Sequence, residues 1–220
     1  MINAYFKGKL VIQDNCIKQN EDLKTSSSIG LLQYLPDDLF WKILCDSCMD
    51  FGPIDFGKIL SFNFWEHTSA ENTTNKRLVE PDVWIETEKR DVIIEAKMRD
   101  SDGQYAIQWK NEIQSIINEQ KNNDKPIILI ALGGNENMQA EKVLDSPIYK
   151  VSWYSLMNTI IKEREKQADN GFVCRILDDV IEVFARQGMM RIQWFDSLPK
   201  FTIKERALVL WFFEFNNTEY

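Results

Sequence analysis

The sequence predicts an α/β fold with a central mixed sheet flanked by helices. Three observations predict it: apolar runs of strand length, amphipathic segments of helical period between them, and the absence of internal repeats. At 220 residues the chain fits a single domain. Within it we expect a core over about 36–152, an N-terminal arm over 1–35 and a mainly helical C-terminal extension over 153–220.

Composition narrows the class of protein. Hydrophobic residues make up 44% of the chain, which is ordinary for a globular protein, and no run of eighteen apolar residues is present. The N-terminal residues lack the apolar core of a signal peptide, so we expect a cytoplasmic protein with no membrane partner. The net charge of −8 argues against a broad surface that coats nucleic acid, although a local basic groove remains compatible with it.

The first fifty residues contain one clear helix. Residues 4–12 fit either a strand or an irregular packing arm, and residues 19–28 indicate a polar loop. Pro36 opens a helix whose first turn holds Asp37 and Asp38, where the helix macrodipole favours acids. Apolar residues then recur at helical spacing until Gly52-Pro53 ends the run.

The middle of the chain predicts a three-stranded meander followed by a helix and a buried strand. The three strands are expected at 58–65, 78–86 and 91–98, and the amphipathic helix at 104–120. Residues 126–132 are apolar without interruption, as in a strand buried on both faces. Gly133-Gly134 ends that strand, and no phosphate-binding G-K-[S/T] follows it.

The remaining segments of the chain alternate between expected helices and expected strands. We expect a short helix at 136–144, a short strand at 148–152, helices at 153–167 and from Asn170-Gly171 to about 187, and a last strand at 191–195. Thr202 and Glu205 form a capping box for a final helix that ends near Phe213.

An acidic hairpin is the most informative feature. Pro81-Asp82 lies in one strand and Glu95-Ala96-Lys97 in the next. If the tight turn centres on Glu88-Lys89, Asp82 faces Glu95 across the antiparallel pair, where opposed Cβ atoms lie about 4.5–5.5 Å apart. Carboxylates so placed repel each other unless a cation lies between them, so they are suited to share one Mg²⁺, with Mn²⁺ able to substitute.

The same register places the neighbouring charges. Lys97 shares the face of Glu95 because strand side chains alternate, and Glu80 falls opposite Lys97 as an outer-shell partner. The metal would polarise a phosphodiester oxygen and lower the pKa of a bound water, while Lys97 orients that water or stabilises developing charge. The alternative is a hairpin whose acids face solvent and pair with Lys97 and nearby arginines.

These residues resemble the PD-(D/E)XK nuclease superfamily, which has the restriction-endonuclease-like fold. The resemblance covers roughly 36–152 and includes Gln108-Trp109-Lys110-Asn111-Glu112, similar to an extra glutamine motif of several member families. It implies that Asp82 and Glu95 are metal ligands, that Lys97 is catalytic, and that Gln108 assists in the site.

Some choices within the resemblance stay open. Gln104, one helical turn earlier, is the rival to Gln108. Some members add an acid from the first helix, commonly a glutamate, and Asp37, Asp38 and Asp46 are available for that role here.

The cysteines, the histidine and several basic residues lie outside the acidic motif. Cys45 and Cys48 form a C-x-x-C inside a helix-like run without a second ligand pair, so we interpret the cysteines as buried free thiols. His67, the single histidine, is interpreted as a loop residue. The basic residues Lys76, Arg77 and Arg99 either touch DNA phosphates or stay solvated. The C-terminal basic residues either form a dimer surface, dock a partner or complete the core.

The sequence therefore predicts a Mg²⁺-dependent nuclease acting on phosphodiester bonds, with DNA as the partner that the resemblance implies, and with a homodimer or partner protein as a further expectation. One rival is a non-catalytic subunit of the same fold that binds nucleic acid or protein. The other is an acidic interaction protein or inhibitor, suggested by the sequence pI near 4.9.

Overall fold

The computed structural model describes residues 1–13, 16–120, 124–167 and 170–189. Its centre is a six-stranded mixed sheet with the strand order β3-β6-β7-β8-β10-β9. The pairs β3–β6, β6–β7 and β9–β10 are antiparallel, and β7–β8 and β8–β10 are parallel. The strands are β3 (Ile59–Phe64), β6 (Val83–Thr87), β7 (Asp91–Ala96), β8 (Ile127–Leu132), β9 (Glu141–Val143) and β10 (Ser146–Val151).

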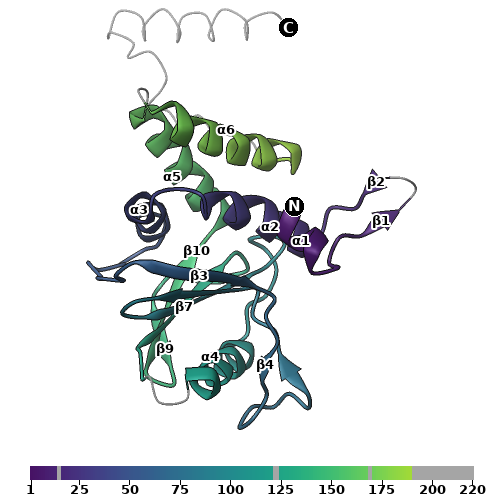
Figure 1. Cartoon of the computed structure of the whole chain (residues 1–220), viewed down its shortest axis with the longest axis vertical. Helices are drawn as coiled ribbons and strands as arrows, with labels where there is room; N and C mark the ends of the chain where they lie inside the picture. The colour runs from purple at the N-terminus through teal and green to yellow at the C-terminus, as the bar shows by residue number, and fades with distance from the viewer. Residues whose placement is uncertain (14–15, 121–123, 168–169, 190–220) are drawn as a thin grey trace, which may run out of the picture. The chain divides into compact units, whose positions relative to one another are not determined.

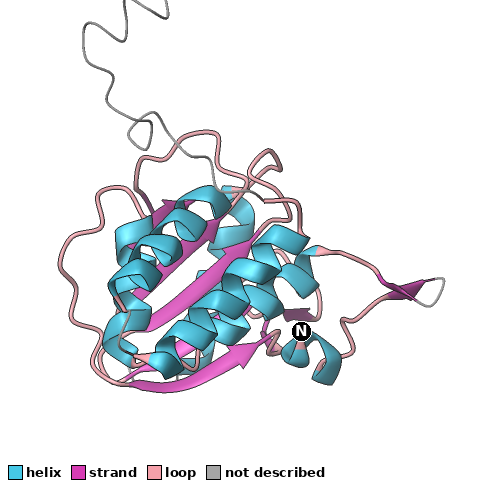
Figure 2. Ribbon diagram, turned by 90° about the horizontal axis from the view of Figure 1, so that it is seen from above, coloured by secondary structure: helices cyan, strands magenta, loops and turns pink. Residues whose placement is uncertain are grey.

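Helices cover both faces of this sheet (Figures 1 and 2). On one face lie α2 (Glu21–Leu32), α3 (Asp37–Ser47) and α5 (Trp153–Lys166), and α6 (Gly171–Arg186) packs on α2 and α5. On the other face lies α4 (Ala106–Gln120), as Figure 1 shows. The architecture is therefore α/β with a mixed sheet between helical layers, as the sequence predicts.

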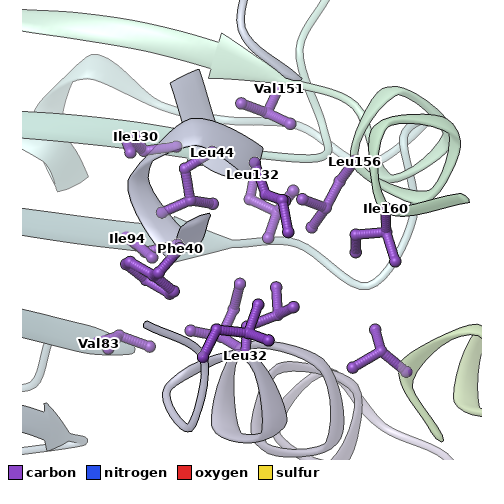
Figure 3. Close-up of a cluster of buried hydrophobic side chains, with 14 of the residues drawn as sticks. Leu32, Phe40, Leu44, Val83, Ile94, Ile130, Leu132, Val151, Leu156 and Ile160 are labelled. Carbon is purple, nitrogen blue, oxygen red and sulfur yellow. The ribbon is translucent and has the colours of Figure 1, made fainter. Parts of the chain in front are cut away.

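Side-chain alternation divides the core between the two faces. Figure 3 shows Val83, Ile94 and Ile130 of the sheet packed with Leu32, Phe40, Leu44 and Leu156 from the first helical layer. Ile93 and Leu129, one residue out of phase, join Ile113 of α4 in a second cluster. The odd-numbered positions of β7 therefore face α4, and Glu95 is one of them.

The predicted hairpin register is confirmed. Val83 pairs with Ile94 and Glu86 pairs with Asp91, and the Thr87 amide donates to the Arg90 carbonyl at 3.0 Å in the turn. Leu78 to Glu86 is not one strand, however. A short hairpin of β4 (Thr68–Ser69) and β5 (Leu78–Val79) forms its own two-stranded sheet, and the chain joins the main sheet at Val83.

Two other expected elements are wrong. Residues 19–28 lie largely in α2 rather than in a loop, because Asn20 caps the helix by accepting from the Leu23 amide at 2.8 Å, and Ile29 and Leu32 are fully buried. Residues 136–144 contain strand β9 rather than a helix, because they pair with the edge of β10. In the N-terminal arm, α1 (Ile2–Phe6) is a helix, and β1 (Ile12–Gln13) pairs with β2 (Cys16–Ile17).

The structure also bears on the predictions for the cysteines and for the turn after β8. Cys45, Cys48 and Cys174 are free thiols, each partly or fully buried. Gly133 and Gly134 follow β8 with φ of 75° and 68° and form the expected turn. The expected strand at 191–195 and the final helix lie outside the described residues. Within the part of the chain that is described, no helix is long and apolar enough to cross a membrane.

Candidate active site

The acidic hairpin brings its carboxylates together at the carboxyl end of β7. Asp82 immediately precedes β6, and its Oδ2 accepts from the Ala96 amide at 2.9 Å. Its Oδ1 accepts from the Trp65 indole at 3.0 Å. Asp82 is 7% exposed and Glu95 2% exposed, so both acids lie in the protein interior rather than on a solvated hairpin.

Lys97 lies at the edge of this acidic pair. Its ammonium contacts the Glu95 Oε1 directly and donates to the Ala96 carbonyl at 3.2 Å. The lysine side chain is 15% exposed, against 3% for the Glu95 side chain, so the ammonium lies nearer to solvent than the acid that it contacts.

Helix α4 contributes an amide and a third acid. Gln108 Nε2 donates to Glu95 Oε1 at 2.5 Å. Glu112, one helical turn later, is 2% exposed, and its Oε2 has no hydrogen-bond partner among the described residues. Of the two glutamines proposed from sequence, Gln108 is therefore the one that reaches the carboxylate.

Gln104 has a different place. Its Nε2 donates to the carbonyls of Glu95 and Gly133 at 3.1 and 3.2 Å, and its Oε1 accepts from the Trp109 indole at 2.8 Å. Gln104 therefore joins β7 and the turn after β8 through their backbone carbonyls, and joins α4 through the Trp109 side chain.

The electrostatics follow from this burial. Burial raises the pKa of Asp82 well above its usual range, and the charge of Glu95 raises it further. Burial and the charge of Glu112 raise the pKa of Glu95 well above its usual range despite the contact with Lys97. Burial raises the pKa of Glu112 to about 8. Burial lowers the pKa of Lys97, but the Glu95 contact outweighs it and the net shift is upward.

A glutamate that the sequence reasoning missed lies beside this cluster. Glu21, in the first turn of α2, accepts from the Met98 amide through Oε2 at 2.8 Å. Burial raises its pKa, while the charge of Lys97 opposes the shift. The local signal was present, because Asn20 is a good N-cap and acids favour the first helical turn.

The residues expected from the first helix do not join the site. Asp37 accepts from the Ile59 amide at 2.9 Å, and Asp46 pairs with Lys42 at 2.6 Å. Asp38 is exposed near Lys42 at the start of α3. The acid from the helical layer that reaches the residue after Lys97 is Glu21 of α2, through its bond with the Met98 amide.

The expected pairing of Glu80 with Lys97 is wrong. Glu80 contacts Lys9 of the N-terminal segment and lies 2.9 Å from His67 Nε2. The reason is that the regular ladder ends at Val83, so the period-two register does not extend to residue 80. His67 is exposed, as expected of a loop residue.

The candidate phosphate-contacting residues remain at the surface. Lys76 and Arg77 are exposed in the segment that joins β4 to β5, and Arg99 is exposed two residues after Lys97. Asn111 of α4 fixes the β4–β5 segment by accepting from the Thr74 amide at 3.1 Å.

A buried lysine anchors the chain directly after Lys97. Lys24 of α2 is 5% exposed and donates to the Met98 carbonyl at 2.9 Å, while its ammonium lies 4.1 Å from the centre of the Trp153 ring. The Trp153 indole in turn donates to the Lys97 carbonyl at 2.6 Å. Helices α2 and α5 therefore hold the two peptide groups on either side of Met98, directly after Lys97.

The donor set suits a hard cation that keeps most of its water. Within residues 1–13, 16–120, 124–167 and 170–189, no group of three or more His, Cys, Asp or Glu side chains is arranged to hold a metal ion. Asp82 and Glu95 supply two carboxylates, and Mg²⁺ is commonly bound through one or two carboxylates and several waters. Glu112 adds a third buried carboxyl beside them, and one of its oxygens has no hydrogen-bond partner among the described residues.

Comparison with known proteins adds no assignment. No protein-family model and no curated protein matches this chain. The functional conclusion therefore depends on the geometry of the site.

Proposed function

We propose that this chain is a Mg²⁺-dependent nuclease of the PD-(D/E)XK superfamily with a restriction-endonuclease-like fold, and that it hydrolyses phosphodiester bonds in DNA. The observation that carries the proposal is the placement of Asp82, Glu95 and Lys97 at one end of an antiparallel hairpin, with Gln108 hydrogen-bonded to Glu95. The sheet order and flanking helices are compatible with that fold.

Charge balance supports a cation in the site. Three buried acids converge there, namely Asp82, Glu95 and Glu112, and Lys97 contacts one of them, Glu95. Ionised carboxylates in an apolar interior cost several kcal/mol each unless they are compensated. Asp82 and Glu95 would hold the metal, which when bound supplies Lewis-acid polarisation of the scissile phosphodiester and lowers the pKa of its water.

The protein groups have separate roles. Lys97 presents a positive charge where negative charge develops on the phosphate, and its contact with Glu95 keeps it charged. Gln108 fixes the orientation of the Glu95 carboxylate. Glu21 supplies the helix acid that some members of the superfamily add, and it also holds the peptide after Lys97.

The direct test is cleavage of linear, circular and single-stranded DNA with Mg²⁺, Mn²⁺ or EDTA. Wild type is compared with Asp82→Asn and Glu95→Gln, and the control is Asp91→Asn, a buried acid at the other end of the same strand. We expect metal-dependent cutting that both site variants lose by about a hundredfold or more and that the control retains.

Two results would count against the proposal. Cutting that survives in EDTA, or in both site variants, would show that these acids do not hold a catalytic metal. A folded wild type that binds Mn²⁺ but cuts no DNA would instead favour the non-catalytic or partner-dependent subunit.

A further inference from the structure

A pocket of about 430 Å³ opens beside the candidate active site, between α4 and the hairpin formed by β4 and β5. Gln108 and Glu112 lie in its wall, and Gln108 is hydrogen-bonded to Glu95. Whatever occupies the pocket therefore lies next to the acids that carry the proposed chemistry.

The outer wall of the pocket is aromatic and aliphatic. Tyr105 is 63% exposed and Ile107 is 52% exposed, at the N-terminal end of α4, and both line it. The hydroxyl end of the Tyr105 ring lies against Gly103, where an added Cβ would come within 2.9 Å of the tyrosine hydroxyl. An exposed aromatic ring offers a flat surface for another planar group.

The opposite wall is polar and held in place. Thr74 and Asn75 line it, and the Asn111 side-chain amide donates to Thr74 Oγ1 at 2.7 Å and to Asn75 Oδ1 at 3.2 Å. These contacts join the β4–β5 hairpin to α4, so the pocket has a fixed width rather than being a gap beside a loose loop.

The described lining of the pocket offers no positive charge to an anion. Of the described residues that line the pocket, none is lysine or arginine, and two, Glu80 and Glu112, are acids. One Glu112 oxygen is buried without a hydrogen-bond partner. A phosphate would find no cationic side chain among these lining residues, whereas a neutral planar group with hydrogen-bonding edges matches the walls. Lys76 and Arg77, which follow Asn75 and are exposed, are placed for phosphates outside the pocket.

We propose that this pocket takes one unpaired nucleobase of the substrate, stacked on Tyr105, and hence that the nuclease acts on single-stranded or locally unpaired nucleic acid. This inference rests on the proposed function, because it assigns the substrate class of the same site. A base inside a duplex is stacked on both faces and paired along one edge, so it reaches such a pocket only after it is extruded.

The test uses a short single-stranded DNA that carries 2-aminopurine at successive positions, with EDTA present to prevent hydrolysis. Stacking changes the fluorescence of this base, so wild type should quench one position selectively and bind the single strand more tightly than the matched duplex. Tyr105→Ala should abolish that quenching and weaken binding about tenfold, whereas Tyr105→Phe keeps the ring and the effect. Phe172→Ala removes an exposed aromatic of α6 outside this pocket and should change nothing.

Equal quenching and affinity in wild type and Tyr105→Ala would overturn the inference, as would tighter binding of the duplex or failure to bind the single strand. The Mg²⁺ cleavage assay separates this result from the proposed function. Cleavage without dependence on Tyr105 removes the nucleobase pocket and leaves the nuclease. Selective quenching without cleavage leaves the pocket and removes the nuclease.

Discussion

The two ends of strand β7 carry buried acids with matching partners. At the amino end, Asp91 is 1% exposed, lies 3.2 Å from the Lys125 ammonium, and accepts from Gln120 of α4 at 2.7 Å. At the carboxyl end, Glu95 also contacts a lysine and a glutamine of α4. Each acid thus has one cation and one amide.

The ends differ in the charge that surrounds them. Asp91 and Lys125 form a balanced pair, and Gln120 also donates to the Lys125 carbonyl at 2.9 Å, which closes the end of α4 onto the strand. Around Glu95, two further buried acids, Asp82 and Glu112, share the single lysine. A balanced buried pair serves structure, whereas excess buried acidity is relieved either by protonation or by a bound cation.

The largest expected effect is a difference between the two lysines: Lys97 should matter for catalysis and Lys125 for stability. Lys97→Ala should lower kcat for DNA cleavage about 10²–10³-fold and leave the fold intact, because it removes charge stabilisation near the phosphate. Lys125→Ala should leave kcat within about threefold but cost about 3 kcal/mol of unfolding free energy, because Asp91 loses its partner. Single-turnover cleavage and urea denaturation measure both quantities. The comparison fails if the two variants behave alike.

Excess acidity predicts a specific pH dependence of stability in the absence of metal. The pKa of Glu112 is about 8 in the folded state against an ordinary value of 4.5. As pH rises between these values, the unfolded chain releases a proton that the folded chain retains, so stability should fall, by about 5 kcal/mol at most. Glu112→Gln should reduce that slope. Urea denaturation in EDTA between pH 5 and pH 8 tests this expectation, and equal slopes in both proteins would contradict it.

A smaller loss of activity is expected from changing Lys24, which contacts the chain after Lys97 rather than the acids themselves. Lys24→Met keeps the length of the side chain but removes the donor to the Met98 carbonyl, so Lys97 loses part of its support. We expect about a tenfold lower kcat with little change in KM. The control is Lys150→Met, which removes another buried lysine near a tryptophan ring, at 5.7 Å from Trp109. A matching loss of activity in the control would reduce Lys24 to a general packing role.

Local patterns predicted much of this fold correctly. The strands at 58–65 and 91–98, the later part of the strand expected at 78–86, the helix at 104–120 and the two helices after Ser152 follow from period and capping, which short stretches of chain determine. The register of the hairpin follows from its tight turn, since the turn sets every later pair. Strand β9 was mistaken for a helix because edge pairing, not its own periodicity, makes it a strand.

The sequence by itself determined which hairpin carries Asp82 and Glu95, and that Lys97 shares their end of the sheet. Only the tertiary structure decided that Glu21 reaches Met98, 77 positions away, and that Glu112 is buried against Glu95. The physical reason is range: a turn and a period of two act between neighbours, whereas the packing of α2 and α4 on opposite faces brings together residues with no local relation. The same packing left one end of β7 balanced in charge and the other acidic.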